Sequence, residues 1–238
     1  MLISFCRLGV MLGVYTAGIS GAHLNPAVTF ANCVYRKFPW RKFPVYLAAQ
    51  VLGAMCSAAV VYANYKSAID VFEGGPGIRT VGTNTSSAGI FCTYPAAFMT
   101  KTGQFFSEFI ASTILMFCIY ALKDEGNLGA GNLTPLGLFF VIFGIGACFG
   151  WETGYAINLA RDFGPRLVSY MIGYGHEVWS AGGYYFWVSQ PQTRHFHPSD
   201  ISFRCQWSRL SSAAVSEVGF MMSSCSPETA LSTLLGWG

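Results

Sequence analysis

Two short turns contain the residues whose types and spacing suggest chemistry. They cover residues 20–29 and 154–165, and each pairs an asparagine, Asn25 or Asn158, with an alanine two positions later. In the first turn Asn25 is a good helix N-cap, and Pro26 suits the first helical position, where its missing N–H costs nothing. A helix N-terminus carries a partial positive charge and N–H groups without partners. Two such ends meeting at the middle of a membrane would orient passing hydroxyl groups and oppose cations.

The helix that follows the first turn is short. Only about ten residues separate Pro26 from a basic cluster at residues 36–42, and ten helical residues rise about 15 Å, half the thickness of a bilayer. Irregular backbone beside a half-helix is tolerated within a membrane only where it lines a cavity or is buried in protein. The first turn therefore predicts a pore.

The composition places these turns in a membrane protein. Of the 238 residues, 53% are hydrophobic and 11% are charged, against about 25% charged in a soluble domain. This deficit argues against a water-soluble enzyme. Three stretches, residues 44–65, 104–122 and 134–151, are long and apolar enough to span a bilayer. Residues 8–20 and 182–188 are too short to do so.

The distribution of charge predicts the orientation. Arg36, Lys37, Arg41 and Lys42 precede the first span, and the positive-inside tendency places such clusters in the cytoplasm. Residues 66–101 would then lie outside, where the sequon at residues 84–86 is usable. Residues 123–132 would lie in the cytoplasm.

Several other classes of function find no support in the sequence. The net charge is only +3, without a basic run that would follow a phosphate backbone, so nucleic acid is not an expected partner. The eight cysteines form no C-x-x-C pair, and we expect no metal or cofactor. His195 and His197 lack a third ligand. A nucleophile with its base and a carboxylate pair are also missing, so we expect no enzyme.

The two turns closely resemble the signature loops of the major intrinsic protein family, the aquaporins and glycerol facilitators. The resemblance extends from about residue 8 to residue 188. It implies an all-α membrane protein, a right-handed aquaporin-like helical bundle with two re-entrant half-helices. Against that pattern the first span is missing and the last is incomplete, so the chain looks truncated at both ends. We expect a channel domain over residues 1–188 and a polar, serine-rich tail over 189–238 that is disordered or spuriously translated.

The resemblance assigns the pore centre to the two motifs. The first motif is Asn25, Pro26 and Ala27, and the second is Asn158, Leu159 and Ala160. The amides of Asn25 and Asn158 would point into the pore where the half-helices meet. Leu159 stands where the family carries proline, and we expect this to loosen the second half-helix by about 1 kcal/mol or less.

The resemblance also implies the roles of six further residues. Arg161 would line the outer constriction, and Tyr155 would form its aromatic wall. Gly146 replaces a histidine of water-selective members, and Asp162 is typical of the glycerol branch. Two buried ionisable residues would support the re-entrant loops through hydrogen bonds; they are His23 and Glu108.

These features lead to a functional prediction. We expect a passive channel for glycerol and water, in a multi-pass protein of the plasma membrane that contacts the lipid bilayer. The resemblance implies a homotetramer. The alternative is a truncated subunit that conducts nothing and interacts with full-length relatives.

Overall fold

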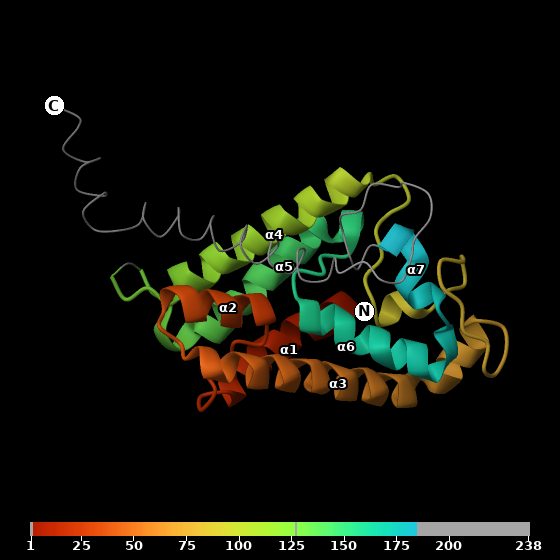
Figure 1. The fold of residues 1–238 in the computed structure, drawn as a ribbon, viewed down its shortest axis with the longest axis horizontal. Coiled ribbons are helices and arrows are strands. Elements are labelled where there is room, and N and C mark those ends of the chain that lie inside the picture. The colour runs from red at the N-terminus through yellow and green to blue at the C-terminus, as the bar shows by residue number, and fades with distance from the viewer. Residues whose placement is uncertain (1, 127, 185–238) are drawn as a thin grey trace.

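The computed structural model describes residues 2–126 and 128–184. These residues form helices joined by loops, with no strand among them, which confirms the expected all-α class (Figure 1). The α-helices are α1 (Leu2–Thr16), α2 (Pro26–Tyr35), α3 (Phe43–Phe72), α4 (Lys101–Leu122), α5 (Thr134–Thr153), α6 (Leu159–Ser169) and α7 (Glu177–Tyr184). Short turns of other helix types are η1 (Trp40–Lys42), η2 (Ala88–Ile90), η3 (Gly131–Leu133) and the π-helical η4 (Tyr170–Tyr174).

Three helical segments are long and apolar enough to cross a membrane. They are Trp40–Phe72, Lys101–Leu122 and Gly131–Thr153, at the positions of the three predicted spans. The first continues seven residues beyond the predicted end at residue 65. Polar Lys66 and Asp70 lower the hydropathy of its last two turns without breaking the helix, which ends before Gly74 at φ +90°. The 30 residues of α3 rise about 45 Å, more than the hydrocarbon core of a bilayer requires.

The predicted bounds of the first short segment were wrong. Helix α1 covers Leu2–Thr16 rather than residues 8–20. It stops because the backbone amides of Ser20 and Gly21 both donate to the carbonyl of Ala17, and this closes a tight turn. The turn ends at Gly21, whose φ of +76° suits glycine. The chain is thereby redirected into the first motif.

Two half-helices occupy the middle of the molecule. Helix α2 has 10 residues and α6 has 11, so each rises about 15 Å. Figure 1 shows them end to end with their N-termini directed toward each other, between α3 on one side and α4 and α5 on the other. The half-helix predicted from Asn25 and Pro26 is confirmed.

Helix α6 packs closely against α3 at one glycine. A Cβ atom on Gly164 would lie 2.8 Å from the Cβ of Ala54 and 2.8 Å from the carbonyl oxygen of Val51. Any side chain there would separate the two helices, since neither neighbour can move aside easily. Gly164 therefore fixes how deeply α6 sits beside α3.

Some predictions fall outside the described residues. The domain boundary at residue 188, the tail over 189–238, and the histidines His195 and His197 lie there. Of the short apolar stretch at 182–188, the structure describes only the part up to Tyr184, which ends α7.

Candidate functional site

Each motif asparagine caps the half-helix that follows it. Asn25 is extended, with φ −148° and ψ 128°, and its side-chain oxygen accepts a hydrogen bond from the amide of Ala27 at 2.9 Å. Asn158 is extended in the same way, and its oxygen accepts from the amide of Arg161 at 3.2 Å. The helices begin at the next residue, Pro26 or Leu159. The second cap thus forms without proline.

The same two side chains tie the loops to each other. The Nδ2 amide of Asn25 donates to the carbonyl of Ile157 at 2.9 Å, and that of Asn158 donates to the carbonyl of Leu24 at 2.8 Å. Each carbonyl belongs to the residue before the opposite asparagine. The pattern is therefore reciprocal, and it holds the two helix N-termini together.

The loop backbones repeat one strained conformation. Ala22 and Leu24 have positive φ of 52° and 53°, and Tyr155 and Ile157 have 42° and 36°. These residues stand three and one positions before each asparagine. A non-glycine residue in this region costs about 1–3 kcal/mol and persists only where its surroundings hold it. Such strain is typical of functional sites.

A buried carboxylate holds the second loop. Oε1 of Glu108, on α4, accepts from the hydroxyl of Thr153 at 2.6 Å and the amide of Ala156 at 2.9 Å. Its Oε2 accepts from the amide of Ile157 at 2.8 Å. The carboxylate is thereby committed to the loop, and the strained amides have a charged acceptor.

Neutral groups hold the first loop. The hydroxyl of Thr29 donates to the carbonyl of Asn25 at 3.1 Å, and the side-chain amide of Gln50 on α3 donates to the Thr29 oxygen at 3.1 Å. Nδ1 of His23 lies 3.3 Å from the same oxygen. The ring of His23 also packs edge-on against Phe38, with the centroids 4.8 Å apart.

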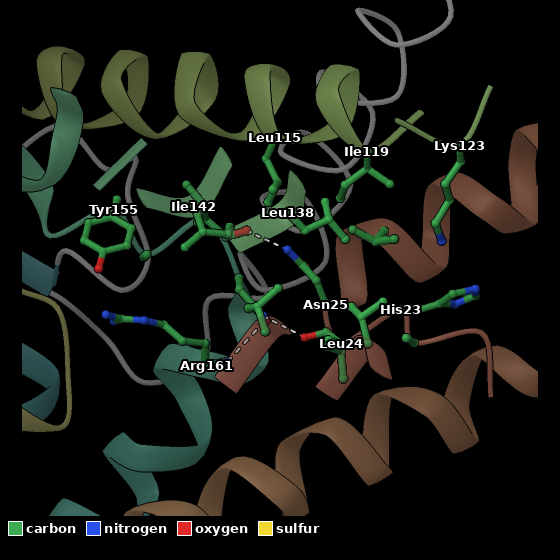
Figure 2. Close-up of a pocket in the computed structure, with 17 residues that line it drawn as sticks. His23, Leu24, Asn25, Leu115, Ile119, Lys123, Leu138, Ile142, Tyr155 and Arg161 are labelled. Atoms are coloured by element: carbon green, nitrogen blue, oxygen red, sulfur yellow. Dashed lines mark hydrogen bonds between the residues drawn. The ribbon is translucent and has the colours of Figure 1, made fainter. Parts of the chain in front are cut away.

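A cavity of about 100 Å³, the central cavity, runs past the two motifs (Figure 2). One face carries polar groups, contributed by Asn25, Asn158 and Arg161. The other face is apolar and is built by residues of α1, α2, α4 and α5. They are Val10, Val14, Val28, Leu115, Ile119, Leu138 and Ile142.

Arg161 and Tyr155 separate this space from a second one. Both line the central cavity and also a cavity of about 220 Å³, the loop cavity, whose wall includes Thr93 and Tyr94. The guanidinium carbon of Arg161 lies 5.7 Å from the centroid of the Tyr155 ring. Its Nη1 is buried and has no hydrogen-bond partner among the described residues. This donor can therefore serve a molecule in the passage.

Six of the ten expected pore residues line neither cavity: Pro26, Ala27, Leu159 and Ala160 form the first turns of the half-helices, and Gly146 and Asp162 lie farther along their helices. Asp162 is buried, and its Oδ1 accepts from the amide and hydroxyl of Thr93 at 2.8 and 2.7 Å. Its Oδ2 accepts from Nε of Arg166 at 2.6 Å. Gly146 is buried in α5. The structure places neither Asp162 nor Gly146 in the lining of the two cavities.

Sequence reasoning missed three residues at these cavities. Gly150 lines the loop cavity, and a Cβ atom there would lie 3.1 Å from Cδ1 of Tyr155. Its position one turn after Gly146 could have suggested a shared helix face. Cys92 lines the same cavity, and burial, followed by the Asp162 charge, raises the pKa of its thiol to about 11. Lys123 lines the central cavity.

Comparison with known proteins links this geometry to one family. The family model described as major intrinsic protein matches residues 3–189. The chain is 86% identical over 181 residues to aquaglyceroporin-9 of Botryotinia fuckeliana and 77% identical over 181 residues to probable aquaglyceroporin-2 of Gibberella zeae. Each match covers 76% of this chain, but only 40% and 54% of those relatives.

A solved structure has a similar fold. The X-ray structure of the aquaglyceroporin from Plasmodium falciparum matches with a TM-score of 0.75 at 28% sequence identity. The match covers 96% of this chain and 84% of that one. The fold of this chain is thus similar to that of a solved aquaglyceroporin.

Proposed function

Because the chain belongs to the major intrinsic protein family, we propose that it is a passive channel for glycerol and water. It is a multi-pass membrane protein. The observation that carries the proposal is the central cavity, which has an apolar face on one side and the donors of Asn25, Asn158 and Arg161 on the other. The relatives of 86% and 77% identity are named aquaglyceroporins, which supports the same solute class.

A polyol matches both faces at once. The carbon backbone of glycerol would lie against Leu115, Ile142 and their apolar neighbours, and its hydroxyl groups would face the asparagine amides and Arg161. Hydrogen bonds from the pore offset the loss of water around those hydroxyls. Water itself would follow the polar face.

The constriction would select by size and by charge. Tyr155 offers an apolar wall opposite the Arg161 guanidinium, and Gly150 leaves room behind the tyrosine ring. Arg161 and the positive ends of two half-helices oppose cations. A neutral, narrow and linear solute meets all these conditions.

We place the channel in the plasma membrane, as a homotetramer surrounded by lipid and without enzymatic activity. The apolar side chains that α3 exposes support a lipid or subunit contact, because only 6% of its most apolar 18-residue stretch is buried. Examples are Val45, Leu52 and Val60.

Swelling of proteoliposomes tests the function. Vesicles that contain the full chain should take up glycerol and water faster than empty vesicles, as followed by stopped-flow light scattering. Ile142→Trp places a large ring in the central cavity and should lower glycerol uptake at least about fivefold, since pore width limits conduction. Phe140→Trp is the matched control, because Phe140 lies on the same helix with an exposed side chain.

Two outcomes would contradict the proposal. Equal glycerol uptake by the Ile142→Trp and Phe140→Trp proteins would mean that solute does not follow the central cavity. Absence of both fluxes in vesicles with verified inserted protein would instead favour a non-conducting subunit that interacts with full-length relatives.

A further inference from the structure

A second cationic side chain lies at the central cavity, far from Arg161. Lys123 follows the last residue of α4, Leu122, and lines the cavity. Figure 2 shows its amine directed toward His23, at the end opposite Arg161 and Tyr155. The two cations thus bracket the motif asparagines, with one at each end of the passage.

The ammonium group of Lys123 has no counter-ion in the part of the chain that the structure describes. The neighbouring carboxylate of Asp124 accepts from the amide of Gly126 at 3.0 Å. Partial burial, followed by the positive charge of Arg36, lowers the pKa of Lys123. The place of Lys123 at the C-terminal end of α4 therefore sets its position. No carboxylate among the described residues forms an ion pair with it.

Within the described residues, no carboxylate lines the central cavity, and its lysine and arginine are both cations. The charged or basic lining residues are His23, Lys123 and Arg161. The Glu108 carboxylate binds the second loop. That of Asp162 binds Arg166 at 2.6 Å and lies 4.0 Å from Nη1 of Arg161, outside the cavity lining. A cation entering from either end would meet a fixed positive charge with little water to screen it.

We propose that Lys123 is a second cation barrier, which excludes cations at the end of the pore that Arg161 does not guard. The proposal rests on the proposed channel function. The two barriers act in series, so either one is enough to stop a cation that has passed the other. Neutral polyols pass both, and the Lys123 ammonium can donate hydrogen bonds to their hydroxyl oxygens as they leave.

Series barriers have a distinctive signature in a double-mutant cycle. When two resistances of similar size dominate a series, removal of one raises the current about twofold, whereas removal of both raises it further, up to the limit set by the positive ends of the half-helices. The probe is methylammonium, measured as current across planar bilayers that contain the full chain. At about pH 6 this amine is almost fully protonated.

The variants are Arg161→Val, Lys123→Met and the double variant, with currents normalised to inserted protein. We expect small increases from each single substitution and a large one from the double variant. Arg161→Val combined with Arg41→Met is the matched control, because Arg41 is an exposed cation in η1 that lines neither cavity. Combining Arg161→Val with Lys123→Glu should give a larger current than combining it with Lys123→Met, because the charge is then inverted.

The result that overturns the inference is a methylammonium current in the Lys123 double variant no greater than in the Arg41 control. That result would leave the channel function intact if the unmodified chain takes up glycerol. Conversely, the unmodified chain could fail to take up glycerol while the Lys123 double variant conducts methylammonium. That result would support the cation barrier and contradict glycerol as the solute.

Discussion

The two halves of the pore have the same backbone and different chemistry. Helix α2 contains no charged residue, whereas α6 carries Arg161, Asp162 and Arg166 within its 11 residues. Both begin after an extended, capping asparagine, and both are preceded by residues of positive φ at the same two positions. The shared backbone brings the helix ends together, whereas only the second half-helix contributes a charged side chain, Arg161, to the cavity lining.

The side chains that support the two loops also differ in charge. Neutral groups of Thr29 and Gln50 hold the first loop, and the Glu108 carboxylate holds the second. Helix α6 is also anchored by Arg166, which is fully buried and bonds to Asp162 and to the carbonyls of Thr93 and Val178. Substitution of a charged supporting residue should destabilise the fold more than substitution of a neutral one, because it leaves a buried charge without its partner.

Loss of Arg166 tests this asymmetry with the largest expected effect. Arg166→Met leaves Asp162 buried without its partner at 2.6 Å, and this should destabilise the fold by about 3–5 kcal/mol. The midpoint of thermal unfolding in detergent measures it. Arg161→Met, on the same helix, should shift that midpoint far less, because Nη1 of Arg161 has no hydrogen-bond partner among the described residues. Equal shifts would mean that Arg166 is no special anchor.

Exchanging the loop supports tests the asymmetry at an intermediate level. Glu108→Gln replaces one acceptor oxygen with an amide that faces a loop N–H, at a cost of about 1–3 kcal/mol. Gln50→Leu removes one neutral hydrogen bond of 3.1 Å and should cost about 1 kcal/mol. We expect glycerol permeability to fall further in the Glu108 variant. The opposite order would show that the first loop is the more sensitive one.

The smallest expected effects come from the first helical positions. Asn158 already has φ −150° and ψ 109°, a conformation that a following proline favours. Leu159→Pro should therefore stabilise the chain by about 0.4–1 kcal/mol, and Pro26→Leu should destabilise it by a similar amount. Unfolding midpoints measured in parallel check both. A destabilised Leu159→Pro protein would mean that α6 starts differently from α2 in solution.

The sequence alone determined the local elements of this protein. Asn25 and Pro26 specify a helix start because capping and a preset φ act within a few residues. The three spans follow from apolar stretches of bilayer length, which need no partner to be recognised. The motifs, read as a family resemblance, also led to the roles proposed for Asn158, Arg161 and Glu108, which stay predictions until flux is measured.

Only the tertiary structure decided which side chains face the passage. Asp162 and Arg161 are neighbours in sequence, yet Asp162 points to Thr93, 69 residues away, and Arg161 points to the cavities. The sequence also did not indicate that α3 continues seven residues beyond its predicted span. Nor did it indicate that Lys123 lies at the end of the cavity. Their placement depends on how α3, α4 and α6 pack together, and contacts between distant segments leave no local pattern in the sequence.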